Sequence, residues 1–148
     1  MRPSLTFRVL SAPLPDKVVL AFREDAGWSN RDTATLGGAG GPGGLVQWVT
    51  VEAGKKRVAI ARLELAPPQF GFVSDLIVLR AHRGRGVGEW FMKQIEQHCL
   101  LLGIPRVLLQ PMDDNRGFYE KLDFVADPLV AGFLKKEIRP QQRRMLPF

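Results

Sequence analysis

Several residue types are scarce in this chain of 148 residues, and each scarcity narrows what the protein can be. Because Cys99 is the single cysteine, an intrachain disulfide is excluded. One cysteine and two separated histidines, His82 and His98, form no cluster of zinc ligands, so we expect no metal site. No apolar run approaches the ~20 residues of a membrane helix, and the N-terminal residues lack the apolar segment of a signal peptide. We therefore expect a cytoplasmic protein that does not associate with membranes.

The formal net charge of +6 is compatible with a nucleic acid, an anionic surface or a small anionic molecule as partner. Basic residues gather in two places, over 80–85 and in the tail over 139–144. Neither place interleaves basic with aromatic residues or contains a known reader motif, so we expect no nucleic acid. The tail is interpreted as a solvated end. The first group surrounds glycines, whose backbone binds anions, and it favours a small anionic ligand.

Periodicity along the chain predicts a mixture of helices and strands. Alternating or β-branched segments predict strands over 5–10, 45–51, 57–65, 72–79, 106–110 and 133–138. Helical spacing predicts helices over 16–24, 30–36, 87–102 and 115–122, with a glycine-rich loop over 37–44 and a hairpin turn over 54–56. Hairpin strands come first and a strand–helix–strand unit follows. This order predicts an α/β (α+β) fold with a central mixed, mostly antiparallel sheet flanked by helices, and the length fits a single domain over 1–148.

The segment Arg83-Gly84-Arg85-Gly86-Val87-Gly88 joins the most apolar predicted strand to the best amphipathic helix. The first turn of a helix has unpaired N–H groups and a positive dipole end, and glycine lets the backbone approach a ligand. The segment therefore predicts an anion cradle. A P-loop pattern is absent, and Glu89 stands where a Rossmann pattern needs glycine. The glycines over 38–43 do fit G-x-G-x-x-G, but no strand and helix flank them, so we interpret them as a loop.

Two motifs carry a resemblance to a known family. Arg83, Gly86 and Gly88 occupy the positions of R-x-x-G-x-G, which resembles the coenzyme A signature [Q/R]-x-x-G-x-[G/A] of the GNAT superfamily of N-acetyltransferases. Residues 115–124, NRGFYEKLDF, resemble the family's segment N…FYxKLGF. At Asp123 the family usually has glycine, so we expect a positive φ there, which Asp tolerates better than most residues.

The resemblance implies a GNAT-like domain in which two central strands part to form a V-shaped cofactor cleft. The strand ending near Val78 would part from the strand over 106–110, and its free backbone edge would pair with the pantetheine arm of acetyl-CoA. The pyrophosphate would lie on the turn over 83–88. Asn115 would bond the pantetheine arm or cap the helix that follows it. The residues that the resemblance assigns to the cofactor are Leu76, Ile77, Val78, Arg83, Gly84, Arg85, Gly86, Val87, Gly88, Glu89, Asn115, Phe118 and Tyr119.

Tyr119 matches the family's catalytic tyrosine and is the only tyrosine in the chain. A phenol with a pKa near ~10 can protonate a leaving thiolate, so Tyr119 is the candidate general acid. The alternative is that Tyr119 only packs beside Phe118. We interpret Cys99 as a core residue and His98 as an exposed residue without a partner.

The base that takes the proton of the incoming amine is less defined. Glu64, Asp75 and Glu52 lie on or near strands that border the predicted cleft. Some polyamine acetyltransferases carry a Glu immediately before the position of Asp75, where this chain has Ser74. Glu64 acting through water is the candidate base, and the alternative is a solvent-facing strand carboxylate.

The resemblance implies direct transfer from acetyl-CoA to a primary amine, with both substrates bound in a ternary complex. A small-molecule amine is the first candidate, and a protein or peptide N-terminus or lysine is the second. A non-catalytic acetyl-CoA-binding sensor or partner module is a further alternative. Specificity would come from Trp28, the loop over 37–44, which could close on a substrate, and the strand over 45–51. A homodimer is left open.

Overall fold

The computed structural model describes residues 4–28, 45–112 and 114–138. The predicted helix over 30–36, the loop over 37–44 and the basic tail over 139–144 lie outside these residues. The described elements are β1 (Leu5–Val9), α1 (Asp16–Asp25), β2 (Leu45–Ala53), β3 (Lys56–Ala66), β4 (Phe70–Val78), the 3₁₀ turn η2 (Arg80–His82), α2 (Val87–Leu101), β5 (Arg106–Leu109), α3 (Arg116–Lys121), β6 (Val125–Ala126) and β7 (Leu134–Glu137).

The strands form one sheet of seven in the order β1-β2-β3-β4-β5-β7-β6. Every neighbouring pair is antiparallel except β4 and β5, which run parallel. A parallel pair needs a crossover connection, and α2 supplies it. The predicted mixed, mostly antiparallel sheet flanked by helices is confirmed.

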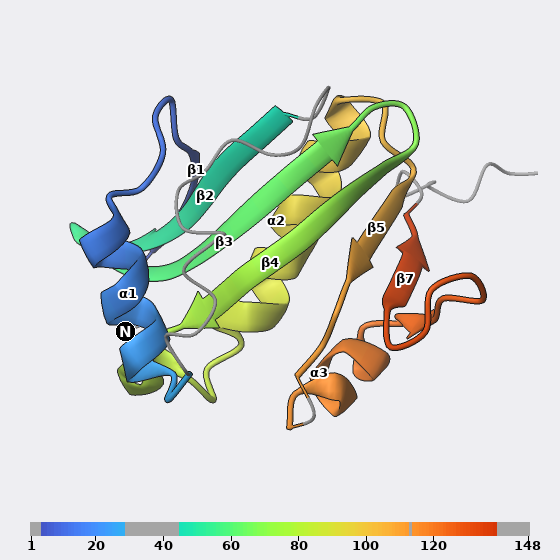
Figure 1. The fold of residues 1–148 in the computed structure, drawn as a ribbon. Coiled ribbons are helices and arrows are strands. Elements are labelled where there is room, and N and C mark those ends of the chain that lie inside the picture. The colour runs from blue at the N-terminus through green and yellow to red at the C-terminus, as the bar shows by residue number, and fades with distance from the viewer. Residues whose placement is uncertain (1–3, 29–44, 113, 139–148) are drawn as a thin grey trace, which may run out of the picture.

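Two apolar clusters cover opposite faces of the sheet, because successive side chains of a strand point to opposite sides. On one face α1 packs Val19 and Phe22 against Trp48, Ile60 and Ile77. On the other face the larger cluster joins α2 to the strands (Figure 1), and its buried helix residues are Val87, Phe91, Met92, Ile95 and Cys99. Their spacing is that of one helix face, as the sequence predicts. Among the described residues, no helix is both long and apolar enough to cross a membrane.

The two central strands stay together over a short stretch only. β5 pairs with β4 at Gly71, Phe72 and Val73, and the ladder ends there, although β4 continues to Val78 beside β3. The ribbons of β4 and β5 diverge from this point toward α3 (Figure 1). The predicted parting of the central strands is confirmed.

The observed elements match the predicted ones with small shifts at their ends. β4 starts at Phe70, two residues before its predicted start at 72, and the hairpin turn contains Gly54 at φ 62°. β6 was not predicted, because its two residues are too few to show a period.

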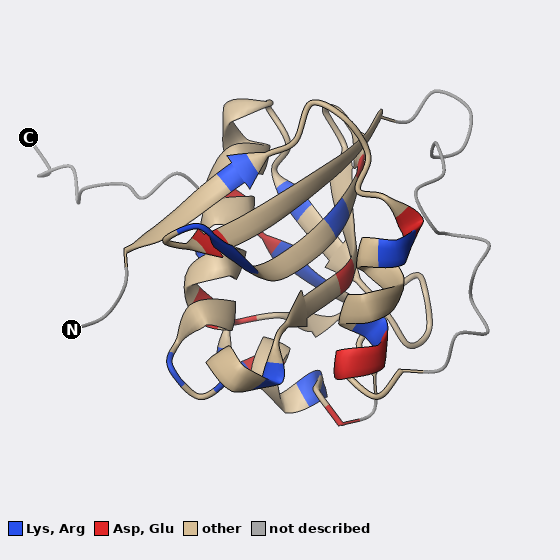
Figure 2. Ribbon diagram, turned by 90° about the vertical axis from the view of Figure 1, so that its left-hand side faces the viewer, with Lys and Arg blue, Asp and Glu red and all other residues tan. Residues whose placement is uncertain are grey.

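Charges of both signs lie along the strands and helices (Figure 2). Several pair across elements, such as Arg8 with Glu52 at 2.6 Å and Lys136 with Glu96 at 2.9 Å. Each such pair removes one charge of either sign, so the excess of six basic residues is carried by side chains outside these pairs.

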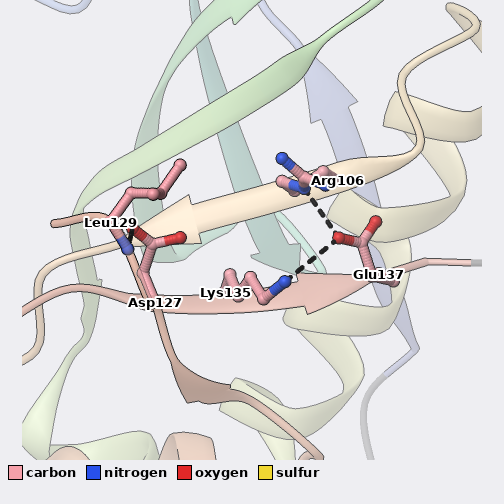
Figure 3. A network of polar contacts seen from close by, with 5 residues as sticks. All are labelled: Arg106, Asp127, Leu129, Lys135 and Glu137. Atoms are coloured by element: carbon pink, nitrogen blue, oxygen red, sulfur yellow. Dashed lines mark hydrogen bonds and ion pairs between the residues drawn. The ribbon is translucent and has the colours of Figure 1, made fainter.

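An exposed polar network lies at the β5–β7 side of the sheet (Figure 3). Glu137 accepts a hydrogen bond from Nε of Arg106 at 2.7 Å and contacts Nζ of Lys135 at 3.5 Å. In the turn before β7, Asp127 Oδ2 accepts the N–H of Leu129 at 3.1 Å. Water screens such exposed pairs, so they add little to stability.

Candidate functional site

A cavity of about 460 Å³ opens where β4 leaves β5. Its lining residues are Ala26, Trp28, Leu76, Ile77, Val78, Arg83, Gly84, Gly86, Val87, Gly88, Glu89, Asp114, Asn115, Phe118 and Tyr119. Twelve of the thirteen residues assigned to the cofactor from the sequence are among them. The exception is Arg85, which lines a neighbouring cavity of about 330 Å³ together with His82, Trp90 and Lys93.

The glycine turn lines the cavity, except at Arg85, and has backbone amides without a protein acceptor. Gly84 and Gly86 have φ of 75° and 79°, a conformation that favours glycine. The first hydrogen bond of α2 runs from the N–H of Trp90 to the carbonyl of Gly86 at 3.0 Å. Within the described part of the chain, no backbone N–H from Gly84 to Glu89 donates to a protein acceptor. These donors and the helix dipole make the turn suitable for a phosphate group.

Gly88 is required for close packing rather than for its backbone angle. A Cβ at this position would lie 3.2 Å from Cζ of Phe118 and 3.7 Å from a methyl of Val78. The first turn of α2 therefore contacts α3 closely, which brings the glycine turn and the second motif to one cavity.

The β4 edge and the turn are connected by the arginine of the signature. Nε of Arg83 donates to the carbonyl of Val78 at 2.9 Å. On its other side β4 remains paired with β3, since Ile77 faces Ile60 and Val78 faces Ala59. The edge over 76–78 therefore faces the cavity with a backbone that only one neighbour strand holds.

Tyr119 is buried, with 6% of its surface exposed, yet it lines the cavity. Its ring makes edge contacts with Phe118 and Phe124, with centroids 5.1 Å and 5.7 Å away. Burial raises the pKa of the Tyr119 phenol to about 12, because the phenolate would lose its hydration. Tyr119 thus packs beside Phe118 and also lines the cavity, and its role as general acid stays a prediction.

Asn115 stands at the N-cap of α3, but its side chain makes no capping hydrogen bond, so the capping alternative is wrong. Its Oδ1 is buried and has no hydrogen-bond partner among the described residues. A buried acceptor without a donor is unfavourable. Since Asn115 lines the cavity, a ligand N–H could satisfy this oxygen.

The candidate bases are all engaged in ion pairs. Glu64 lies opposite Phe72 on the neighbouring strand, pairs with Arg62, and is not among the residues that line the cavity. Asp75 is buried against Arg23, and Glu52 pairs with Arg8 at the far side of the sheet. The structure thus places Glu64 apart from Tyr119.

Trp28, predicted as a specificity residue, lines the cavity. Three other features of the structure were not predicted from the sequence. Ala26 and Asp114 line the cavity, and neither belongs to a motif that could identify it. The pairing of Arg23 with Asp75 joins residues 52 positions apart, a separation that periodicity cannot bridge. His98 was expected to be exposed and unpartnered, which is wrong: it is half-buried, and Nε2 lies 2.7 Å from Oε1 of Gln47. Among the described residues, no group of His, Cys, Asp and Glu side chains could hold a metal ion.

The sequence profile of the Acetyltransferase (GNAT) family matches residues 15–124. The chain belongs to this family. The resemblance drawn from the two motifs is therefore confirmed, and the predicted class of enzyme, an N-acetyltransferase, agrees with this family. The matched region includes α1, the diverging strands β4 and β5, the glycine turn and α3.

Known proteins agree with this GNAT assignment. Glucosamine 6-phosphate N-acetyltransferase 1 of Oryza sativa subsp. japonica is 32% identical over 91 residues, which are 57% of this chain and 55% of that protein. The chain thus spans about half the length of this curated relative. In fold, it resembles the PaiA N-acetyltransferase of Thermoplasma acidophilum in complex with coenzyme A (TM-score 0.66, 14% identity, 91% of this chain and 99% of that one). It also resembles the N-acetylglutamate synthase of Neisseria gonorrhoeae complexed with coenzyme A and L-arginine (TM-score 0.68, 12% identity, 93% of this chain and 34% of that one).

Proposed function

We propose that this GNAT protein transfers an acetyl group from acetyl-CoA to the primary amine of a small molecule, with both substrates bound in a ternary complex. The observation that carries the proposal is the cavity at the parting of β4 and β5, in which unbonded amides, a strand edge and a buried phenol meet. We further propose that residues 1–148 form one domain of this kind, in the cytoplasm.

The residues that line the cavity fit coenzyme A. The amides from Gly84 to Glu89 are free to bond a diphosphate, and Arg83 adds positive charge beside them. The β4 edge over 76–78 and Oδ1 of Asn115 offer acceptors and donors to an amide-containing arm. When bound, acetyl-CoA would supply the activated acetyl group as a thioester.

The chain would promote transfer through placement and hydrogen bonding. An N–H of the β4 edge over 76–78 would polarise the thioester carbonyl as an oxyanion donor. The Tyr119 hydroxyl, with a pKa of about 12, stays protonated at neutral pH and would donate to the leaving sulfur. A thiol has a pKa near ~8.5, so full proton transfer from this phenol is uphill, and its main contribution is a hydrogen bond that strengthens as negative charge develops on the sulfur.

The amine must lose a proton before it attacks. Glu64 acting through water is the proposed acceptor of this proton. Its carboxylate pairs with Arg62, and its place outside the cavity lining makes the water necessary. The Glu64→Gln variant is expected to lower kcat while leaving coenzyme A affinity unchanged.

The acceptor is proposed to be a small-molecule amine, and the curated relative named for glucosamine 6-phosphate makes amino sugar phosphates the first to test. The deciding experiment is a screen of diverse amines with acetyl-CoA and detection of the released thiol. Turnover with a small amine supports the proposal. Turnover with peptides alone would favour a protein N-acetyltransferase, and tight coenzyme A binding with no thiol release would favour a sensor or partner module. The molar mass in solution, measured over a range of protein concentrations, would test whether the chain forms a homodimer.

A further inference from the structure

A buried ion pair joins α1 to β4 next to the cavity. Nε of Arg23 donates to Oδ1 of Asp75 at 2.7 Å, and Nη2 donates to Oδ2 at 2.8 Å. The two side chains are only 4% and 5% exposed. Because desolvation offsets most of the attraction in a buried ion pair, such a pair is weak evidence for stability. Its fixed two-pronged geometry is better suited to positioning.

Asp75 lies at an irregularity of β4. Its φ is 49°, in the left-handed region, which is unusual for a residue inside a strand. The pairing register slips at the same place: Ile77 faces Ile60, but Ser74 faces Arg62, so β4 has one residue more than β3 between these pairs. This is a β-bulge, and bulges bend a strand and re-aim its side chains.

The bulge coincides with the point where the cavity begins. The last pairing of β4 with β5 is at Val73, two residues before Asp75. The cavity-lining edge over 76–78 starts directly after Asp75. A backbone held at positive φ needs surrounding contacts that fix it. The bidentate bond from Arg23 is such a contact, and it acts on Asp75, the residue directly before the parted edge of β4.

The end of α1 is also tied to η2, which follows β4 closely in the chain. Asp25 accepts the backbone N–H of Arg80 at 2.8 Å through Oδ2, and its carbonyl accepts Nε of Arg80 at 2.5 Å. The carbonyl of Arg23 accepts the N–H of Trp28 at 2.9 Å, and Trp28 lines the cavity. Two links thus flank the edge over 76–78, one before it and one after it.

We propose that Arg23 and Asp75 are positioning residues of the GNAT site. Their ion pair holds the bulge of β4, so that the edge over 76–78 faces the cavity in one register and Trp28 keeps its place in the cavity lining. The effect on turnover rests on the proposed function. The effect on the backbone of residues 76–78 does not, because it concerns the ligand-free chain.

Three variants separate the charge pair from the backbone angle. Asp75→Asn keeps a residue that tolerates positive φ but removes the charge. Asp75→Gly tolerates the angle better still and removes the side chain altogether. Arg23→Lys keeps the charge and loses the two-pronged geometry. Arg106→Lys and Glu137→Gln are the matched controls, since this pair (Figure 3) has the same 2.7 Å contact and is exposed. Neither residue is among those that line the cavity.

The readouts are amide ¹H–¹⁵N shifts of residues 76–78, coenzyme A affinity by calorimetry, and kcat and KM by thiol release, all on protein shown to be folded by its thermal melt. We expect all three variants to move the shifts of 76–78 and to lower kcat by ~10-fold or more through misalignment. Coenzyme A affinity should change by less than ~3-fold, because the amides over 84–89 dominate it. The controls should resemble the wild type.

A folded Asp75→Gly or Arg23→Lys variant with wild-type shifts over 76–78 and wild-type kcat would overturn the positioning role. If Asp75→Gly does not fold, Asp75→Asn and Arg23→Lys decide by the same measurements. A wild-type chain that neither binds coenzyme A nor releases thiol would refute the proposed function instead, and the amide shifts would then decide the positioning role by themselves.

Discussion

At the scale of single residues, Tyr119 combines two properties that usually exclude one another. It belongs to the apolar core, where Phe118 and Phe124 hold its ring, and it also lines the candidate cofactor cavity. Burial keeps the phenol neutral, with a pKa of about 12, and thereby keeps it a hydrogen-bond donor throughout the physiological pH range.

Replacing Tyr119 by Phe removes only the hydroxyl. We expect Tyr119→Phe to lower kcat by ~10²-fold, since general acid–base groups contribute about this much, with little change in coenzyme A affinity. Steady-state kinetics with the best amine of the screen, alongside calorimetry with coenzyme A, measure the two effects. A variant with wild-type kcat would remove Tyr119 from the mechanism.

The same hydroxyl gives stability a defined dependence on alkaline pH. The pKa of Tyr119 is raised from 10.0 to about 12 by folding, so between these values the unfolded chain ionises first and binds fewer protons than the folded one. Its contribution is fully present below pH 10 and is lost as the pH rises toward 12, by about 2–3 kcal/mol in total.

Denaturant unfolding of wild type and Tyr119→Phe at several pH values between about 9 and 11 measures this loss. The wild type should lose stability relative to the variant as the pH rises. Parallel curves for the two proteins would contradict the burial of the phenol.

Two aspartates mark how far single residues can be predicted from the sequence. Asp123 was expected at positive φ, because it replaces a family glycine after a helix, and its φ is 72°. Asp75 has φ 49°, and nothing around it in the sequence signals this. Its angle follows from a bulge between β3 and β4 and from Arg23 of α1, which are contacts between segments rather than properties of a segment.

At the scale of elements, the turn that opens α2 is the feature on which the proposed binding of coenzyme A depends. Its conformation comes from Gly84 and Gly86 at positive φ, and its closeness to α3 from Gly88. The turn and its helix were predicted well from the sequence, since the glycine spacing and the amphipathic pattern over the 15 residues of α2 are both local signals. The two-residue β6 and the exact start of β4 were missed, because pairing with a neighbour strand sets them.

A glutamate at Gly86 would bring a carboxylate into the amide turn. Like charges in contact cost several kcal/mol, so we expect Gly86→Glu to weaken coenzyme A binding by ~100-fold or more. Gly103→Glu is the matched control: Gly103 has φ 77° against 79° at Gly86, both positions have free space around a Cβ, and Gly103 follows the opposite end of α2, about 25 Å away.

Calorimetry with coenzyme A on both variants tests this prediction. The two substitutions carry the same backbone strain and charge, so a selective loss in Gly86→Glu identifies the turn as the phosphate site. Equal affinities in the two variants would contradict it, whatever their effect on the thermal melt.

At the scale of the whole molecule, the cavity is built from three separated stretches of chain, 26–28, 76–89 and 114–119. The family resemblance brought the second and third together in advance, because both carry a motif. The end of α1 could not be placed, since an amphipathic helix shows which face it buries but not which strand it covers. The position of Ala26 in the cavity lining and the bond from Arg23 to Asp75 of β4 could therefore not be predicted from the sequence.

The core also encloses the only thiol of the chain. Cys99 has no exposed surface, and burial, together with the nearby charge of Glu96, raises its pKa to about 11. A thiolate is the reactive form, so we expect a disulfide reagent to label the native protein very slowly and to label one thiol per chain after unfolding in guanidinium. Rapid labelling of native protein would contradict this burial.

It follows that a colorimetric sulfhydryl reagent added to a reaction mixture would react with the coenzyme A released by turnover and hardly at all with the buried thiol of the folded protein. Any slow additional colour would count molecules that have lost their fold, so a single cuvette could report activity and inactivation together.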